Sequence, residues 1–101
     1  MAKIHKFQDD ITKEVANSLK ESIAIDTEAT GLQIPERDKL SLIQICDQNG
    51  VVYIIQPDRK NYKAPNLVKV LEDASILKIG HYLRFDKSAL EFFLKCKIKS
   101  I

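Results

Sequence analysis

The chain is poor in the features that mark several classes of protein. It has no tryptophan and only two cysteines, Cys46 and Cys96, which lie far apart and form no C-x-x-C pair. We therefore expect reduced thiols in a cytoplasmic protein. No run of about 18 apolar residues is present, so no membrane span is expected. The first ten residues, M-A-K-I-H-K-F-Q-D-D, contain no apolar signal core.

The composition indicates one small globular domain and leaves its function open. A chain of 101 residues is long enough for a single domain and no more. Hydrophobic residues make up 45% and charged residues 30%, which is ordinary for a soluble globular protein. The formal net charge of +2 is too small to indicate a nucleic-acid partner by itself.

Apolar periodicity and turn signals predict an α/β domain. Asp9 or Asp10 is expected to cap the first helix, and D-Q-N-G at 47–50 to form a turn between two strands. L-S-L-I-Q-I-C at 40–46 suits a strand covered on both faces, and the tail at 95–101 alternates as a strand would. Helices are expected at about 10–20, 66–72 and 86–95, and strands at 3–7, 22–25, 40–46, 51–55 and 76–79.

These elements predict a mixed sheet. The three strands joined by short loops are expected to be antiparallel. The strand reached through a helix is expected to run parallel to one already placed. The predicted architecture is therefore a mixed α/β sheet with helices packed on it.

The stretch S-I-A-I-D-T-E-A-T-G-L at residues 22–32 carries the first chemical signal. Asp26 and Glu28 follow a short apolar strand, and at i and i+2 their side chains point to the same side, with Thr27 facing away. Two neighbouring carboxylates repel each other, and a bound divalent cation removes that conflict. Oxygen ligands favour Mg²⁺ or Mn²⁺, which serve phosphodiester hydrolysis. The alternative is that Asp26 and Glu28 are ordinary turn residues.

A second acidic segment, K-I-G-H-Y-L-R-F-D at residues 78–86, crosses from a strand to a helix. His81, Arg84 and Asp86 crowd this turn. Sites in α/β sheets gather at the carboxyl ends of strands, so these side chains are candidates for function. The alternative makes Asp86 a helix N-cap and His81 a loop residue.

Together, D-T-E-A-T-G-L and G-H-Y-L-R-F-D resemble the DEDD family of 3′→5′ exonucleases, and its ribonuclease D branch most closely. Asp26 and Glu28 match the first motif of that family, and Leu32 matches an apolar position that wedges against terminal bases. Asp86 matches the aspartate of the second motif, and His81 fits its H-x-x-x-x-D form. The resemblance covers nearly the whole chain and implies a ribonuclease H-like sheet with flanking helices.

The resemblance implies a metal-dependent 3′→5′ exonuclease that acts on the 3′ end of single-stranded RNA or DNA, with RNA favoured. It implies two Mg²⁺ or Mn²⁺ ions in the complete enzyme. Asp26 would bridge them, Glu28 would hold the first, and Asp86 would serve the second. Arg84 is a candidate for contact with the phosphate backbone of the substrate.

The sequence departs from the family in two places. Tyr82 stands where many members carry Asn, and the third motif, Y-x-x-x-D or H-x-x-x-D, is absent. After Asp86 the one carboxylate side chain is Glu91. We therefore expect residues 1–101 to be the N-terminal part of one exonuclease domain whose C-terminal part is missing. A C-terminal fragment or another copy of the chain would then be its partner, and activity of the chain alone would be very slow or absent.

Two other functions are compared with this one. A non-catalytic remnant of the same fold would carry the first two motifs without activity. A phosphatase or ATPase with a strand-end aspartate is disfavoured, because neither D-x-D nor D-x-G with a glycine-rich phosphate loop occurs.

Overall fold

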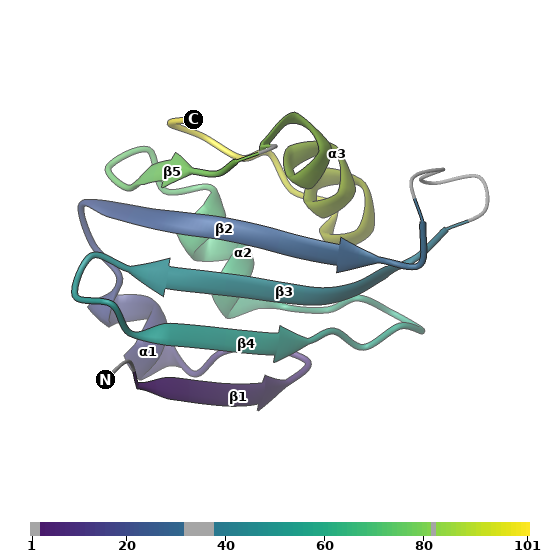
Figure 1. Ribbon diagram of the computed structural model, residues 1–101, viewed down its shortest axis with the longest axis horizontal. Helices are drawn as coiled ribbons and strands as arrows, with labels where there is room; N and C mark the ends of the chain where they lie inside the picture. The colour runs from purple at the N-terminus through teal and green to yellow at the C-terminus, as the bar shows by residue number, and fades with distance from the viewer. Residues whose placement is uncertain (1–2, 32–37, 82) are drawn as a thin grey trace.

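The computed structural model describes residues 3–31, 38–81 and 83–101, whose strands form one five-stranded sheet in the order β1-β4-β3-β2-β5 (Figure 1). The elements in chain order are β1 (Ile4–Gln8), α1 (Lys13–Ser18), β2 (Ser22–Ala29), β3 (Leu40–Asp47), β4 (Val52–Gln56), α2 (Pro65–Leu71), β5 (Leu77–Ile79) and α3 (Leu83–Leu94).

The strand directions confirm the predicted mixed sheet. β2, β3 and β4 pair antiparallel in sequence order, while β5 runs parallel to β2 and β1 runs parallel to β4. The expected turn joins β3 to β4, where the Asp47 carboxylate accepts hydrogen bonds of 2.9 Å from the backbone N–H groups of Asn49 and Val51. Gly50 adopts φ +83° there, a conformation that glycine enters without steric cost.

The core lies between the helices and one face of the sheet. Ile23 and Ile25 of β2 point into it, whereas Ala24, Asp26 and Glu28 alternate to the exposed face. Figure 1 shows α1 and α2 on the buried side of the sheet. The buried apolar residues of all three helices in the described part join the same core. The carboxylates of Asp26 and Glu28 are therefore on the side away from this core.

The expectation that β3 is covered on both faces is wrong for the described part of the chain. Ile43 and Ile45 are fully buried, but Leu42, Gln44 and Cys46 are half-buried on the opposite face. The apolar residues at alternate positions suggested two covered faces, but the helices described here bury only one.

The first helix is capped by a different residue from the one expected. Thr12 is its N-cap, and the Thr12 hydroxyl accepts a 3.1 Å hydrogen bond from the Val15 N–H. Asp10 instead accepts hydrogen bonds from the N–H groups of Asn66 at 2.9 Å and Leu67 at 3.0 Å. Those groups belong to the first turn of α2, which lacks a side-chain cap of its own.

The tail after α3 is not the expected strand. Lys78 N–H donates to the Ser100 carbonyl at 2.7 Å, but Lys99 N–H donates to the Leu71 carbonyl at the end of α2. Bonds to two different elements form no ladder, although Cys96 and Ile98 are buried. Within the described ranges, no helix has the length and apolar character needed to cross a membrane.

Candidate active site

The candidate site lies beside the part of β2 that extends beyond its pairing with β5. β5 pairs with β2 over Ser22–Ala24 only, whereas β3 pairs with β2 as far as Ala29. Gly80 follows β5 and lies against β2, since a Cβ on Gly80 would be 3.0 Å from the Ile25 carbonyl oxygen. The close approach that glycine permits starts α3 beside the unpaired part of β2.

Asp86 occupies this unpaired edge. It lies within the first turn of α3, so it is not the N-cap, and it is only 4% exposed. The hydroxyl of Thr27 donates a hydrogen bond to Asp86 Oδ1. Thr27 faces away from Asp26 and Glu28, as the strand alternation predicted. Its bond to Asp86 could not be read from the sequence.

Asp26, His81 and Asp86 line one open cavity of about 280 Å³. A neighbouring cavity of about 350 Å³ is also lined by Asp26 and His81. The first cavity is lined by Asp26, Thr27, Ala29, Gly31, His81, Phe85 and Asp86. The fold thus brings together one residue of the first acidic segment and two of the second, at the carboxyl ends of β2 and β5.

The pKa of Asp86 depends on its burial and on its neighbours Thr27 and Asp26. Burial raises the pKa of Asp86, and hydrogen bonding from Thr27 opposes that rise. The negative charge of Asp26 raises the pKa of Asp86 further. Two carboxylates of like charge therefore interact across the cavity, which is a common arrangement at functional sites.

The other predicted site residues are not gathered in the cavity. Glu28 is exposed on the same face as Asp26, one strand repeat further along β2. Arg84 is exposed on α3 and lines neither cavity. Leu32, the predicted wedge residue, and Tyr82 lie outside the described residues.

The donors fit a hard divalent cation in kind but not in number. Asp26, Glu28 and Asp86 offer carboxylate oxygens, the ligands that Mg²⁺ and Mn²⁺ prefer. In ranges 3–31, 38–81 and 83–101, however, no group of three or more His, Cys, Asp or Glu side chains could hold a metal ion. One oxygen of the Asp86 carboxylate accepts the hydrogen bond from Thr27.

A second buried carboxylate, Asp38, holds the chain near the cavity. The Thr30 hydroxyl donates to Asp38 at 3.1 Å and accepts from the Lys39 N–H at 2.9 Å. A Cβ on Gly31, which lines the cavity, would collide with the Asp38 carboxylate. This role of Asp38 could not be predicted from the residues beside it, because its partner Thr30 follows the end of β2.

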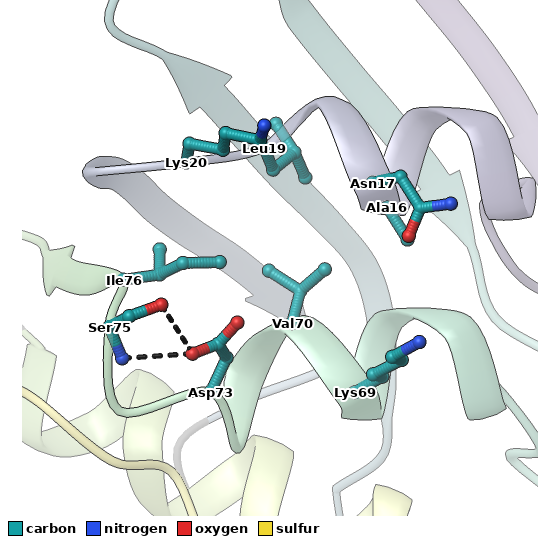
Figure 2. Close-up of a pocket in the computed structure, with 9 residues that line it drawn as sticks. All are labelled: Ala16, Asn17, Leu19, Lys20, Lys69, Val70, Asp73, Ser75 and Ile76. Carbon is teal, nitrogen blue, oxygen red and sulfur yellow. Dashed lines mark hydrogen bonds between the residues drawn. The ribbon is translucent and has the colours of Figure 1, made fainter.

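Another cavity, of about 290 Å³, lies between α1 and α2 (Figure 2). Its polar side chains include Asn17, Lys20 and Lys69. Asp73 also lines it, but the Asp73 carboxylate accepts hydrogen bonds from the N–H and hydroxyl of Ser75. None of the acidic residues of the two sequence motifs lines this cavity.

Comparisons with solved structures find close relatives over nearly the whole chain. A structure described as the apo form of a nuclease is 38% identical with a TM-score of 0.88, covering 97% of this chain and 47% of that one. NrnC of Brucella melitensis is 37% identical with a TM-score of 0.87, covering 96% and 47%. RNase D of Trypanosoma brucei, in complex with RNA U12, shares the fold at 24% identity with a TM-score of 0.67, covering 94% and 36%.

NrnC of Brucella melitensis has also been solved with bound Mg²⁺ and bound to pGG. The chain spans about half the length of the apo nuclease and of NrnC, from 47% to 48%. A comparison with curated protein sequences gives no match. The model of a family described as 3′-5′ exonuclease matches residues 3–101. The resemblance to DEDD nucleases and the ribonuclease H-like fold are thereby confirmed, and the chain belongs to the 3′-5′ exonuclease family.

Proposed function

We propose that this chain supplies part of the active site of a metal-dependent 3′→5′ exonuclease acting on single-stranded nucleic acid, with RNA favoured. The observation that carries the proposal is the interaction of Asp26 and Asp86 across one open cavity, in a chain of the 3′-5′ exonuclease family. Residues 1–101 would form part of one exonuclease domain.

Each acidic residue has a proposed role. Asp26, Glu28 and Asp86 would hold divalent cations, which when bound activate water and stabilise the leaving oxygen of a phosphodiester. The hydrogen bond that the Thr27 hydroxyl donates to Asp86 directs the carboxylate and opposes the rise that burial causes in its pKa. His81 is exposed at the cavity and is available to the phosphate of a substrate.

The substrate class is supported by the relatives above 25% identity. NrnC of Brucella melitensis, in the structure bound to pGG, is 36% identical over 98% of this chain. For the chain described here, Arg84 would contact the phosphate backbone and Leu32 would pack against the terminal base. Loss of Arg84 would then weaken binding to all sequences alike, because phosphate contacts carry no sequence information.

A chimera tests the proposal. Residues 3–101 would replace the matching part of Brucella melitensis NrnC, and the chimera would be incubated with a 5′-labelled oligoribonucleotide and Mn²⁺. We expect stepwise shortening from the 3′ end, at a rate that Asp26→Asn and Asp86→Asn each reduce by about 100-fold or more. Mutation of residues that only orient a metal ligand already lowers metal affinity or activity by about 10–100-fold, and loss of a ligand should cost at least as much. Glu14→Gln, an exposed carboxylate in α1, is the matched control and keeps full activity.

The alternative is a non-catalytic remnant of the fold. One observation favours it, because the described residues contain no group of three donors that could hold a metal ion. A chimera that folds, as judged by circular dichroism and a cooperative melt, but leaves the oligoribonucleotide intact would support the remnant and contradict the exonuclease. Equal activity in the Asp26→Asn chimera would contradict the proposed site.

A further inference from the structure

Thr27 lies between the two acidic residues of D-T-E, yet its side chain forms a hydrogen bond with Asp86 in a distant segment. Strand alternation directs Asp26 and Glu28 to the exposed face and leaves Thr27 half-buried on the other. There the Thr27 hydroxyl donates to Asp86 Oδ1, across 59 positions of the sequence. β2 therefore offers cavity-lining groups from both of its faces at the same point.

Asp86 is held against β2 by hydrogen bonds from Thr27. β5 ends its pairing with β2 at Ala24, so no strand of the described residues covers the edge of β2 beside Thr27. Asp86 enters this edge from the first turn of α3 and is almost fully buried. Among the hydrogen bonds between described side chains, Thr27 supplies the one that Asp86 accepts. The backbone of Thr27 also forms a hydrogen bond with Asp86, so loss of the Thr27 hydroxyl would remove one of the two restraints that Thr27 places on the χ1 and χ2 angles of Asp86.

We propose that Thr27 is a positioning residue, which fixes the Asp86 carboxylate in the cavity that Asp86 shares with Asp26. This inference rests on the proposed function, because the positioned carboxylate is one of the proposed cation ligands. Hydrogen-bond partners that orient a metal ligand act on affinity without touching the metal. Thr27 would therefore set how well Asp86 joins Asp26 at a shared cation.

A purely structural role is the competing explanation. Thr27 would then only seal the open edge of β2, and its loss would lower stability without changing the cation site. Two variants separate the roles. Thr27→Val keeps the shape and β-branching but removes the hydroxyl, and Thr27→Ser keeps the hydroxyl. Thr30→Val is the matched control, because it removes the neighbouring Thr–Asp hydrogen bond to Asp38 and leaves Asp86 untouched.

The first measurement needs no metal. Three-bond NMR couplings report the χ1 rotamer of Asp86 in the 101-residue chain. We expect one rotamer in the wild type, in Thr27→Ser and in Thr30→Val, and averaged couplings in Thr27→Val. An unchanged single rotamer in Thr27→Val overturns the proposal, whatever the melting temperature does.

The second measurement follows free Mn²⁺ by electron paramagnetic resonance. We expect Thr27→Val to weaken Mn²⁺ binding by about 10-fold or more, and Thr27→Ser to restore it. If Asp26→Asn loses Mn²⁺ binding while Thr27→Val binds Mn²⁺ as the wild type does, the role of Thr27 is overturned and the proposed cation site stands. Equal binding by the wild type and Asp26→Asn, or no binding by either, would contradict the proposed cation site and the role of Thr27 with it.

Discussion

The negative charge of Asp26 on β2 adds to burial in raising the pKa of Asp86 on α3. The two carboxylates line the same cavity, and hydrogen bonding from Thr27 works against the rise. Like charges held together disfavour the ionised form of one of them. The ionised form of Asp86 is therefore disfavoured at this position, a conflict that a bound cation would relieve.

Asp86→Asn is expected to stabilise the metal-free chain. The folded-state pKa of Asp86 lies above its ordinary value of 3.8, so the destabilising effect of the charge is absent below that pH. It develops as pH rises through the folded-state pKa and then stays constant. Asn also retains an acceptor for the Thr27 hydroxyl. Urea unfolding from pH 3.5 to 8 measures the difference, and a variant that is no more stable than the wild type at pH 8 would contradict this account.

Gly80→Ala is expected to destabilise the chain by about 1–3 kcal/mol, the usual cost of overpacking. The added methyl would lie 2.9 Å from Leu83 Cδ1 and 3.0 Å from the Ile25 carbonyl oxygen. Gly50→Asn is the control, because nothing lies within 4 Å of a Cβ there and Asn tolerates positive φ. Chemical denaturation compares the two variants. Equal stability of Gly80→Ala and the wild type would show that α3 does not depend on this close approach.

Asp10→Ala is expected to lower the free energy of unfolding by about 0.5–2 kcal/mol, the range for loss of a helix cap. The reason is the pair of hydrogen bonds that Asp10 accepts from Asn66 and Leu67 at the start of α2. Asp10→Asn keeps one acceptor oxygen and should lower the free energy of unfolding by less than Asp10→Ala does. Guanidinium titration of both variants is the measurement, and equal losses would assign the effect to charge instead of hydrogen bonding.

The two thiols are expected to differ sharply in reactivity. Burial raises the pKa of Cys96 to about 11, and Cys96 is 5% exposed, whereas Cys46 is half-buried on the sheet face away from the helices. At pH 8 a chromogenic disulfide reagent should modify Cys46 in the folded chain and Cys96 only after denaturation, because the thiolate is the reactive form. Cys46→Ser isolates the second reaction. Rapid modification of Cys96 in the folded Cys46→Ser chain would be inconsistent with its buried position.

The features that depend on residues close together in the chain could be predicted from the sequence. The hairpin between β3 and β4 follows from D-Q-N-G between two apolar runs, and the parallel placement of β5 follows from the helix before it. Asp26 and Glu28 face the same side because a strand alternates its side chains.

Contacts between distant segments could not be predicted. The bond from Thr27 to Asp86 and the capping of α2 by Asp10 join residues 59 and 56 positions apart. Lys78 is a further case, because Leu77 and Ile79 are exposed while Lys78 is 1% exposed. The Lys78 ammonium donates to the Asp73 carbonyl near the end of α2, a partner that only the packed structure supplies.

The central claim is that Asp26 and Asp86 share a divalent cation, and calorimetric titration of the 101-residue chain with Mn²⁺ tests it most directly. We predict weak binding by the wild type, because only two carboxylates line the cavity in the described part of the chain. Asp26→Asn and Asp86→Asn should each abolish the binding heat, and Glu14→Gln should leave it unchanged. Equal Mn²⁺ binding by the wild type and Asp26→Asn would contradict the claim and place any cation elsewhere.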